Sequence, residues 1–202
     1  MTGFHLLERD SAYMLPELGW YLVDDPPVEF DPDYQTVIYS AWFIENNIAK
    51  RNHVVLYLDW ATALTIAYKK LDENRTAYEV GGFKYNYFGI PVIIMTDKDS
   101  QSAITASYIK AVEGTRLSTD VWRFIKEDDK SMIVVQLSNE IMIEISELVY
   151  RSIQDSYNTA SSIAWQMLGT EITEELQKQI NNGIINLNPW DTGNKKPWPL
   201  ED

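Results

Sequence analysis

The stretch VWRFIKEDDKSMIVVQLSNEIMIEISELVY, residues 121–150, holds the transition that decides the fold class. It begins with two runs rich in β-branched and aromatic residues, at 121–125 and 132–137, and such runs favour β-strands. The charged residues 127–130 separate the two runs, so together they predict a β-hairpin. Ser138 then suits the start of a helix, because its hydroxyl accepts a hydrogen bond from a free backbone amide.

The helix after Ser138 is predicted to be the longest in the chain. Small and apolar residues recur there at steps of three and four for about seven turns, which indicates one buried face. Its small and polar middle argues against a strict coiled coil, although the spacing suits packing along another helix. The residues of this face are Ile141, Ile145, Leu148, Ser152, Ser156, Thr159, Ile163 and Met167.

Another strand pair is predicted before the first helix. Residues 34–44 and 52–58 are rich in β-branched and aromatic residues, and a hairpin is their simplest pairing. Asn46-Asn47 suit a turn. Asp59 suits the N-cap of an amphipathic helix that should end before Gly81-Gly82.

Further elements are predicted from Phe83 onward. Strands at 83–87 and 90–95 flank Phe88-Gly89 and predict a hairpin. Thr96-Asp97-Lys98-Asp99 has the spacing of a capping box. A short helix is expected at 171–180. The helix after the capping box should bury the face formed by Ile104, Tyr108, Ala111 and Val112.

These elements predict an α+β fold, with antiparallel β-hairpins packed with helices around one core, a long C-terminal helix and a small N-terminal β region. We expect an N-terminal arm and β region at 1–58, an α+β domain at 59–187 and a tail with Pro and Trp at 188–202. Residues 1–33 are rich in turn-forming residues and predict an extended arm with one short strand.

Composition excludes several classes of function. The 202 residues carry a net charge of −13, which disfavours nucleic acid and anionic membranes as partners. The absence of cysteine excludes disulfides, thiolate catalysis and cysteine zinc sites, and it suits synthesis in the cytoplasm. No apolar run reaches the length of a transmembrane helix or resembles a signal peptide.

Candidate catalytic chemistry is weak throughout the chain. His5 and His53 lie in different segments without metal-ligand spacing, and no nucleophile–base pair can be assembled. Asp97 and Asp99 could hold a cation, but helix capping explains them better. The acidic helix positions Glu140, Glu144 and Glu147 lack the Glu-x-x-His partners of a di-metal site and suit a solvated face. We therefore expect no enzyme, catalytic residue, metal or cofactor.

Aromatic residues point instead to protein binding. The chain has 7 Trp and 12 Tyr, the residue types that protein interfaces enrich. We predict partner contacts at Trp20 and Tyr21 of the arm and at Trp190 and Trp198 of the tail. Packing inside the protein is the alternative role for each of them.

Residues 78–157 resemble a domain of unknown function found in tailed-phage tail proteins and associated with tail-fibre assembly proteins. The resemblance rests on three patterns: Tyr78-Glu79-x-Gly81-Gly82-Phe83, Gly89-Ile90-Pro91-Val92 and Thr96-Asp97-x-x-Ser100-Gln101. These are followed by Trp122 and the acidic pair Asp128-Asp129. Family members usually have a glycine next, where this chain has Lys130, so that turn is expected to differ.

The resemblance implies a chaperone of tail-fibre assembly, or a fibre-associated protein, with the phage tail-fibre protein as partner. It would act in the host cytoplasm during assembly or stay in the virion tail, and it could form homo- or hetero-oligomers. One alternative is a permanent structural component of the tail, such as an adaptor or fibre subunit. A second alternative is a glycan hydrolase, which would need a pair of carboxyl groups in a cleft.

Overall fold

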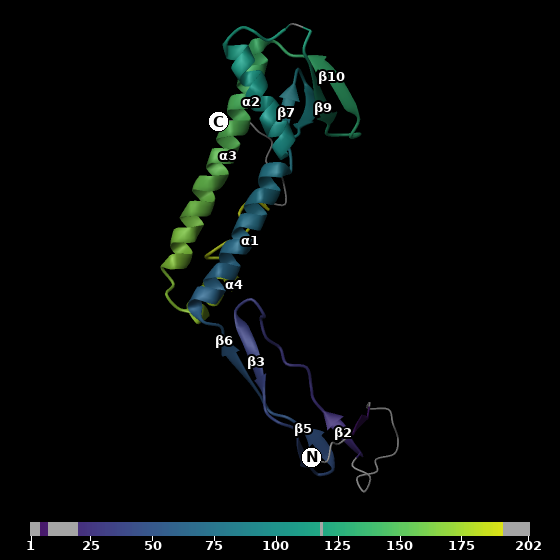
Figure 1. Cartoon of the computed structure of the whole chain (residues 1–202), viewed down its shortest axis with the longest axis vertical. Helices are drawn as coiled ribbons and strands as arrows, with labels where there is room; N and C mark the ends of the chain where they lie inside the picture. The colour runs from purple at the N-terminus through teal and green to yellow at the C-terminus, as the bar shows by residue number, and fades with distance from the viewer. Residues whose placement is uncertain (1–4, 8–19, 118, 192–202) are drawn as a thin grey trace.

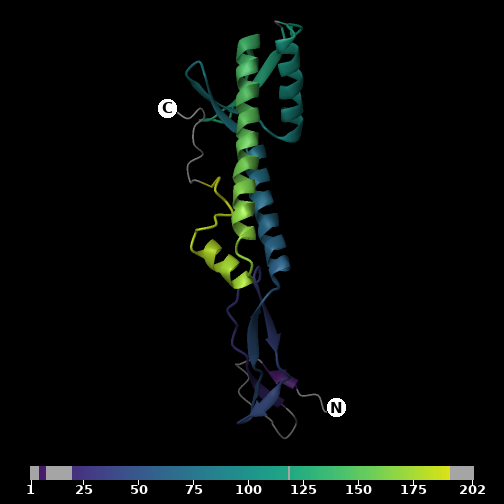
Figure 2. The same cartoon turned by 90° about the vertical axis from the view of Figure 1, so that its left-hand side faces the viewer.

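The molecule is elongated, and its elements follow one another along the long axis (Figure 1). The computed structural model describes residues 5–7, 20–117 and 119–191. A small N-terminal sheet lies at one end, followed by a two-stranded ribbon and a pair of long helices, and a four-stranded sheet lies at the other end (Figures 1 and 2). This arrangement confirms the predicted α+β class.

The hairpins predicted at 83–95 and 121–137 form one antiparallel sheet. Their strands lie in the order β10-β9-β8-β7, joined where Val92 and Ile93 pair with Lys126 and Ile125. The turn between β7 and β8 has positive φ at Phe88 and Gly89, as the tight turn of a two-residue hairpin requires. The bounds are β7 (Phe83–Tyr87), β8 (Ile90–Ile94), β9 (Val121–Lys126) and β10 (Met132–Gln136).

Helix α2 (Lys98–Val112) connects these hairpins, and its start corrects one prediction. The N-cap is Asp97, whose carboxylate accepts from the amides of Asp99 and Ser100. Thr96 is not part of a capping box, because its hydroxyl is buried and accepts from the amide of Gly82. Val112 also departs from the predicted buried face, since 58% of it is exposed.

Helix α3 (Asn139–Leu168) runs beside two partners in succession. Ser138 caps it as predicted, accepting from the amide of Ile141. Its first half packs against α2, and its second half packs against α1 (Trp60–Val80), which begins at the predicted N-cap Asp59 (Figure 1). Helix α4 (Thr173–Asn181) lies beside α1 and begins two residues later than expected, because Glu171 has a left-handed backbone.

The buried apolar residues form two clusters, which corrects the prediction of one core. The first joins the four-stranded sheet to α2 and the beginning of α3, around the fully buried Phe124 and Ile145. The second joins α1, the end of α3 and α4, around Ala67, Met167 and Leu176. Helix α3 contributes to both clusters because its buried face continues along its whole length.

The N-terminal region contains more strand than predicted. The arm supplies β1 (His5–Leu7) and β2 (Trp20–Asp24), which pair in parallel, and β2 also pairs in parallel with β5 (Ile48–Lys50). Residues 34–44 do not form one strand. They divide into β3 (Gln35–Tyr39) and the start of β4 (Phe43–Glu45), and the Asn46-Asn47 turn joins β4 to β5.

Strand β3 pairs with β6 (His53–Tyr57) in the predicted antiparallel arrangement, and we call this two-stranded sheet the ribbon. It lies between the N-terminal sheet and the helices (Figure 1). At the opposite end of the molecule, the β9–β10 turn contains Lys130 with φ 58°, a left-handed conformation that glycine adopts most easily.

Candidate protein-binding surface

The ribbon exposes apolar side chains on both of its faces. The register pairs Ile38 with Val54 and Thr36 with Leu56, so these four side chains share one face. Ile38 and Val54 are each 56% exposed and Leu56 is 43% exposed. The other face presents the exposed Tyr57, paired with Gln35. A two-stranded sheet without a packed face is marginal in water, so this surface suits contact with another protein.

The base of the ribbon is fixed to the helices. Tyr34, just before β3, is buried in the second cluster. The Thr173 hydroxyl of α4 donates to the carbonyl of Leu58, at 2.7 Å. The ammonium of Lys70 on α1 forms an ion pair with Asp33. These contacts hold the ribbon in place while its faces stay exposed.

Burial of Tyr34 gives a pH dependence that tests this anchor. Burial, with the nearby charges of Asp31 and Asp33, raises the pKa of Tyr34 to about 12. A raised pKa means that the folded state holds the proton more tightly, so this stability is lost as pH rises from 10 towards 12. Tyr34→Phe is expected to reduce the alkaline loss in urea titrations at pH 8 to 12. If the unfolding free energy of Tyr34→Phe falls with pH as steeply as that of wild type, this prediction is wrong. Tyr85→Phe is the comparison, because burial also raises the pKa of Tyr85 to about 12.

The far end of the ribbon is held by Arg51. Its guanidinium donates to both carboxylate oxygens of Asp25, at 2.9 and 2.5 Å, and this contact lowers the pKa of Asp25. The same group lies over the rings of Tyr39 and Trp42, at 3.8 and 4.9 Å from the ring centres. Stacking and a two-point ion pair are a combination that arginine provides and lysine does not. Arg51 therefore ties the ribbon to the segment after β2.

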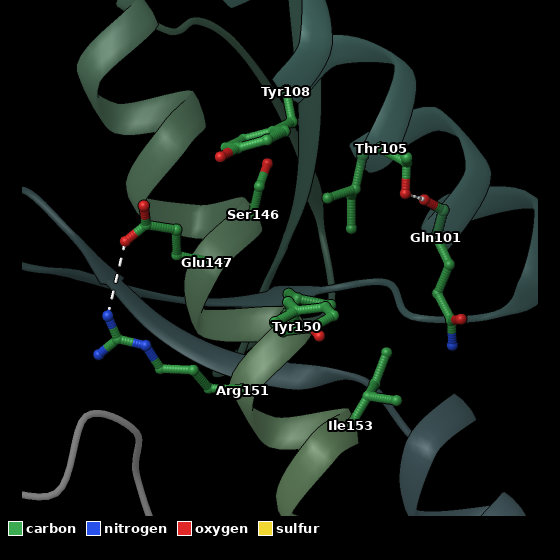
Figure 3. A pocket seen from close by; sticks show the side chains of 10 residues that line it. Gln101, Thr105, Tyr108, Ser146, Glu147, Tyr150, Arg151 and Ile153 are labelled. Carbon is green, nitrogen blue, oxygen red and sulfur yellow. Dashed lines mark hydrogen bonds and ion pairs between the residues drawn. The ribbon is translucent and has the colours of Figure 1, made fainter. Parts of the chain in front are cut away.

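A groove of about 610 Å³ lies between α2 and α3 (Figure 3). Tyr108, Tyr150 and Ile153 are among its lining residues, and Tyr150 is 67% exposed. Among the described lining residues Glu147 is the one carboxylate, and it faces Arg151 at 3.6 Å. Those residues do not supply the pair of carboxyl groups that glycoside hydrolysis needs.

Most polar groups of this groove already have partners within the protein. The Ser146 hydroxyl donates to the carbonyl of Met142, and the Thr105 hydroxyl donates to the carbonyl of Gln101. The Gln101 amide donates to the carbonyl of Thr96. The lining therefore offers few free polar groups to orient a small ligand, and the ribbon is the stronger candidate site.

The structure places three of the four predicted contact residues, and the two of the arm lie apart from Trp190 of the tail. Trp20 and Tyr21 lie in β2 of the N-terminal sheet, where Tyr21 is half-buried and the side chain of Trp20 is outside the described residues. Trp190 is half-buried against the second cluster and stacks on Tyr78, with ring centres 6.1 Å apart. Trp198 lies outside the described residues.

The exposed ribbon residues were inside predicted strands but were not predicted as contacts. In the sequence, these residues belong to an apolar run without alternation. A fully buried strand has the same pattern, so the run does not show that the strand is exposed. Within the described ranges, no group of three or more His, Cys, Asp or Glu side chains could hold a metal ion. No helix among those residues is long and apolar enough to cross a membrane.

Comparisons with known proteins give the chain no relative from which a function could be transferred. No protein-family model, curated protein or solved structure matches it.

Proposed function

We propose that this protein binds another protein during the assembly of a phage tail fibre, with the ribbon as the contact surface. The observation that carries the proposal is the exposure of Ile38, Val54 and Leu56 on one face of a ribbon that is fixed at both ends. The tail-fibre protein is the partner that the resemblance of residues 78–157 implies. That identification is part of the proposal.

The physical reason lies in what an unassembled fibre presents. Chains that will form a β-rich fibre expose apolar surface and strand edges before they assemble, and such surfaces aggregate. A ribbon with apolar faces can cover that surface, while a body with a net charge of −13 keeps the complex soluble. The elongated form supports this role, because helices α1 and α3 extend away from the ribbon on the side opposite the N-terminal sheet (Figure 1).

Val54→Asp tests the contact surface directly. A charge in the middle of the apolar face should weaken binding, because the carboxylate must lose its water on contact. In co-expression with the tail-fibre protein of the same genome, we expect the variant to recover at least about tenfold less fibre protein. Val134→Asp is the matched control, since Val134 is 58% exposed on β10 and Val54 is 56% exposed. Equal recovery by wild type and Val54→Asp would refute the proposal.

The same partner could be held transiently or permanently. Mass spectrometry of purified virions separates a chaperone from a permanent adaptor or fibre subunit. Absence from virions, with recovery alongside the fibre in lysate, identifies a chaperone. A fixed copy number relative to the fibre identifies a structural component.

A further inference from the structure

Among the described residues, none provides a backbone partner to the outer edge of β6. Hydrogen bonds from Leu58 N to Tyr34 O and from Ser40 N to Asn52 O close the two ends of the ribbon ladder. Bonded and non-bonded pairs alternate in an antiparallel ladder, so the backbone groups of His53, Val55 and Tyr57 point outward. No other described segment provides a backbone hydrogen bond to them.

The outer edge of β3 is less open than that of β6. Its outward residues are Gln35, Val37 and Tyr39, and the amide of Gln35 already donates to the carbonyl of Asp31 at 2.7 Å. The β6 edge is therefore the longer continuous row of free donors and acceptors in the ribbon. An open edge of this kind is a template for pairing with another strand.

The ribbon also lacks the charges that usually protect a strand edge. None of the ten residues of β3 and β6 is Asp, Glu, Lys or Arg, in a chain with a net charge of −13. Two copies of this chain repel one another on average, and the ribbon is a surface on which they meet without opposed like charges. Natural edges normally carry lysine, proline or inward-pointing charges to prevent such pairing.

We propose that two copies of this chain pair through β6, antiparallel and edge to edge, about a two-fold axis at Val55. In this register Val55 pairs with Val55 of the other copy, and His53 pairs with Tyr57 of the other copy. The outward backbone groups of all three residues then find partners, as a self-complementary interface requires. The product is a four-stranded sheet, which exceeds the three strands with an apolar face that a sheet needs to be stable in water.

The pairing extends the surface assigned to partner binding. Val54 of one copy comes opposite Leu56 of the other, so the two apolar faces become one continuous face. Because a five-residue edge is short for an obligate interface, the dimer should be reversible and depend on concentration. The pairing itself does not rest on the proposed function, since it needs no fibre protein.

Val55→Pro tests this register. It removes the central outward amide from each copy and leaves the ladder with β3 intact, because proline is tolerated at an edge facing away from its neighbour. By sedimentation equilibrium over a roughly hundredfold concentration range, we expect wild type to dimerise. The dissociation constant of Val55→Pro should be at least about tenfold higher. Val37→Pro is the matched control on the other edge and should dimerise as wild type does.

Hydrogen exchange and a second variant complete the test. With rising concentration, the amides of His53, Val55 and Tyr57 should gain protection, while that of Val37 should not. If Val55→Pro fails to fold, Val55→Lys replaces it, since it places two like charges at the axis. A wild type that stays monomeric, an equal loss of dimer in Val37→Pro, or protection of β6 only on adding fibre protein would each overturn the proposal. The last outcome would assign the edge to the fibre.

Discussion

Phe124→Ala is expected to lower the free energy of unfolding by about 3–5 kcal/mol, because it removes the largest fully buried side chain of the first cluster. Phe124 lies on an inner strand of the sheet and packs against the ring of Tyr87, with ring centres 5.3 Å apart. Sheet, α2 and α3 all contribute to the cluster around it, so the cavity cannot close without moving more than one element. Urea unfolding followed by circular dichroism measures the loss.

Phe88→Ala is the matched control for Phe124→Ala. Phe88 is 79% exposed and also contacts Tyr87, with ring centres 4.8 Å apart. Its removal should change the free energy of unfolding by less than about 1 kcal/mol. Similar urea midpoints for the two variants would contradict the assignment of Phe124 to the core.

Arg75→Met should be similarly damaging, at about 3 kcal/mol, because it leaves a shielded carboxylate without its partner. The guanidinium of Arg75 contacts Glu79 at 2.5 Å, and the two side chains are 11% and 12% exposed. Arg75 also lies over the ring of Tyr157, at 4.1 Å, and the Ser156 hydroxyl of α3 donates to Glu79. The pair therefore connects α1 to α3 between the two clusters.

Arg151→Met provides the comparison for Arg75→Met. Arg151 also pairs with a glutamate four positions away, but its side chain is 66% exposed and the distance to Glu147 is 3.6 Å. An exposed pair of this kind contributes less than about 1 kcal/mol. The double variant Arg75→Met/Glu79→Gln should regain part of the lost stability in the same urea titrations. If Arg75→Met unfolds at the wild-type midpoint, the pair has no role in joining the helices.

Local signals predicted most of the helical half of the fold. Asp59 and Ser138 cap their helices as predicted, because capping depends on a side chain and an amide only a few residues away. The β7–β8 hairpin formed for the same reason, since its two-residue turn fixes which residues face one another. Thr96 was the exception, because its hydroxyl accepts a hydrogen bond from a distant amide, that of Gly82.

Non-local pairing explains what could not be predicted. The parallel pairing of β2 with β5 joins residues that are far apart in sequence, and no local pattern specifies such a partner. The division of the core into two clusters has the same origin, because the periodicity of α3 shows one buried face but not which element covers it. An apolar run such as 52–58 gives no sign of whether its strand is covered or exposed.

The shared use of α3 by both clusters restricts how the length of the molecule can change. A helix turns by about 100° per residue, so inserting one residue near Ser152 would rotate the buried face of one half away from its partners. An insertion of about seven residues, two full turns, would keep both faces aligned and add about 10 Å. The length of α3 can therefore change only in steps that keep its buried face aligned, such as about 7, 11 or 18 residues, each matched by growth of α1.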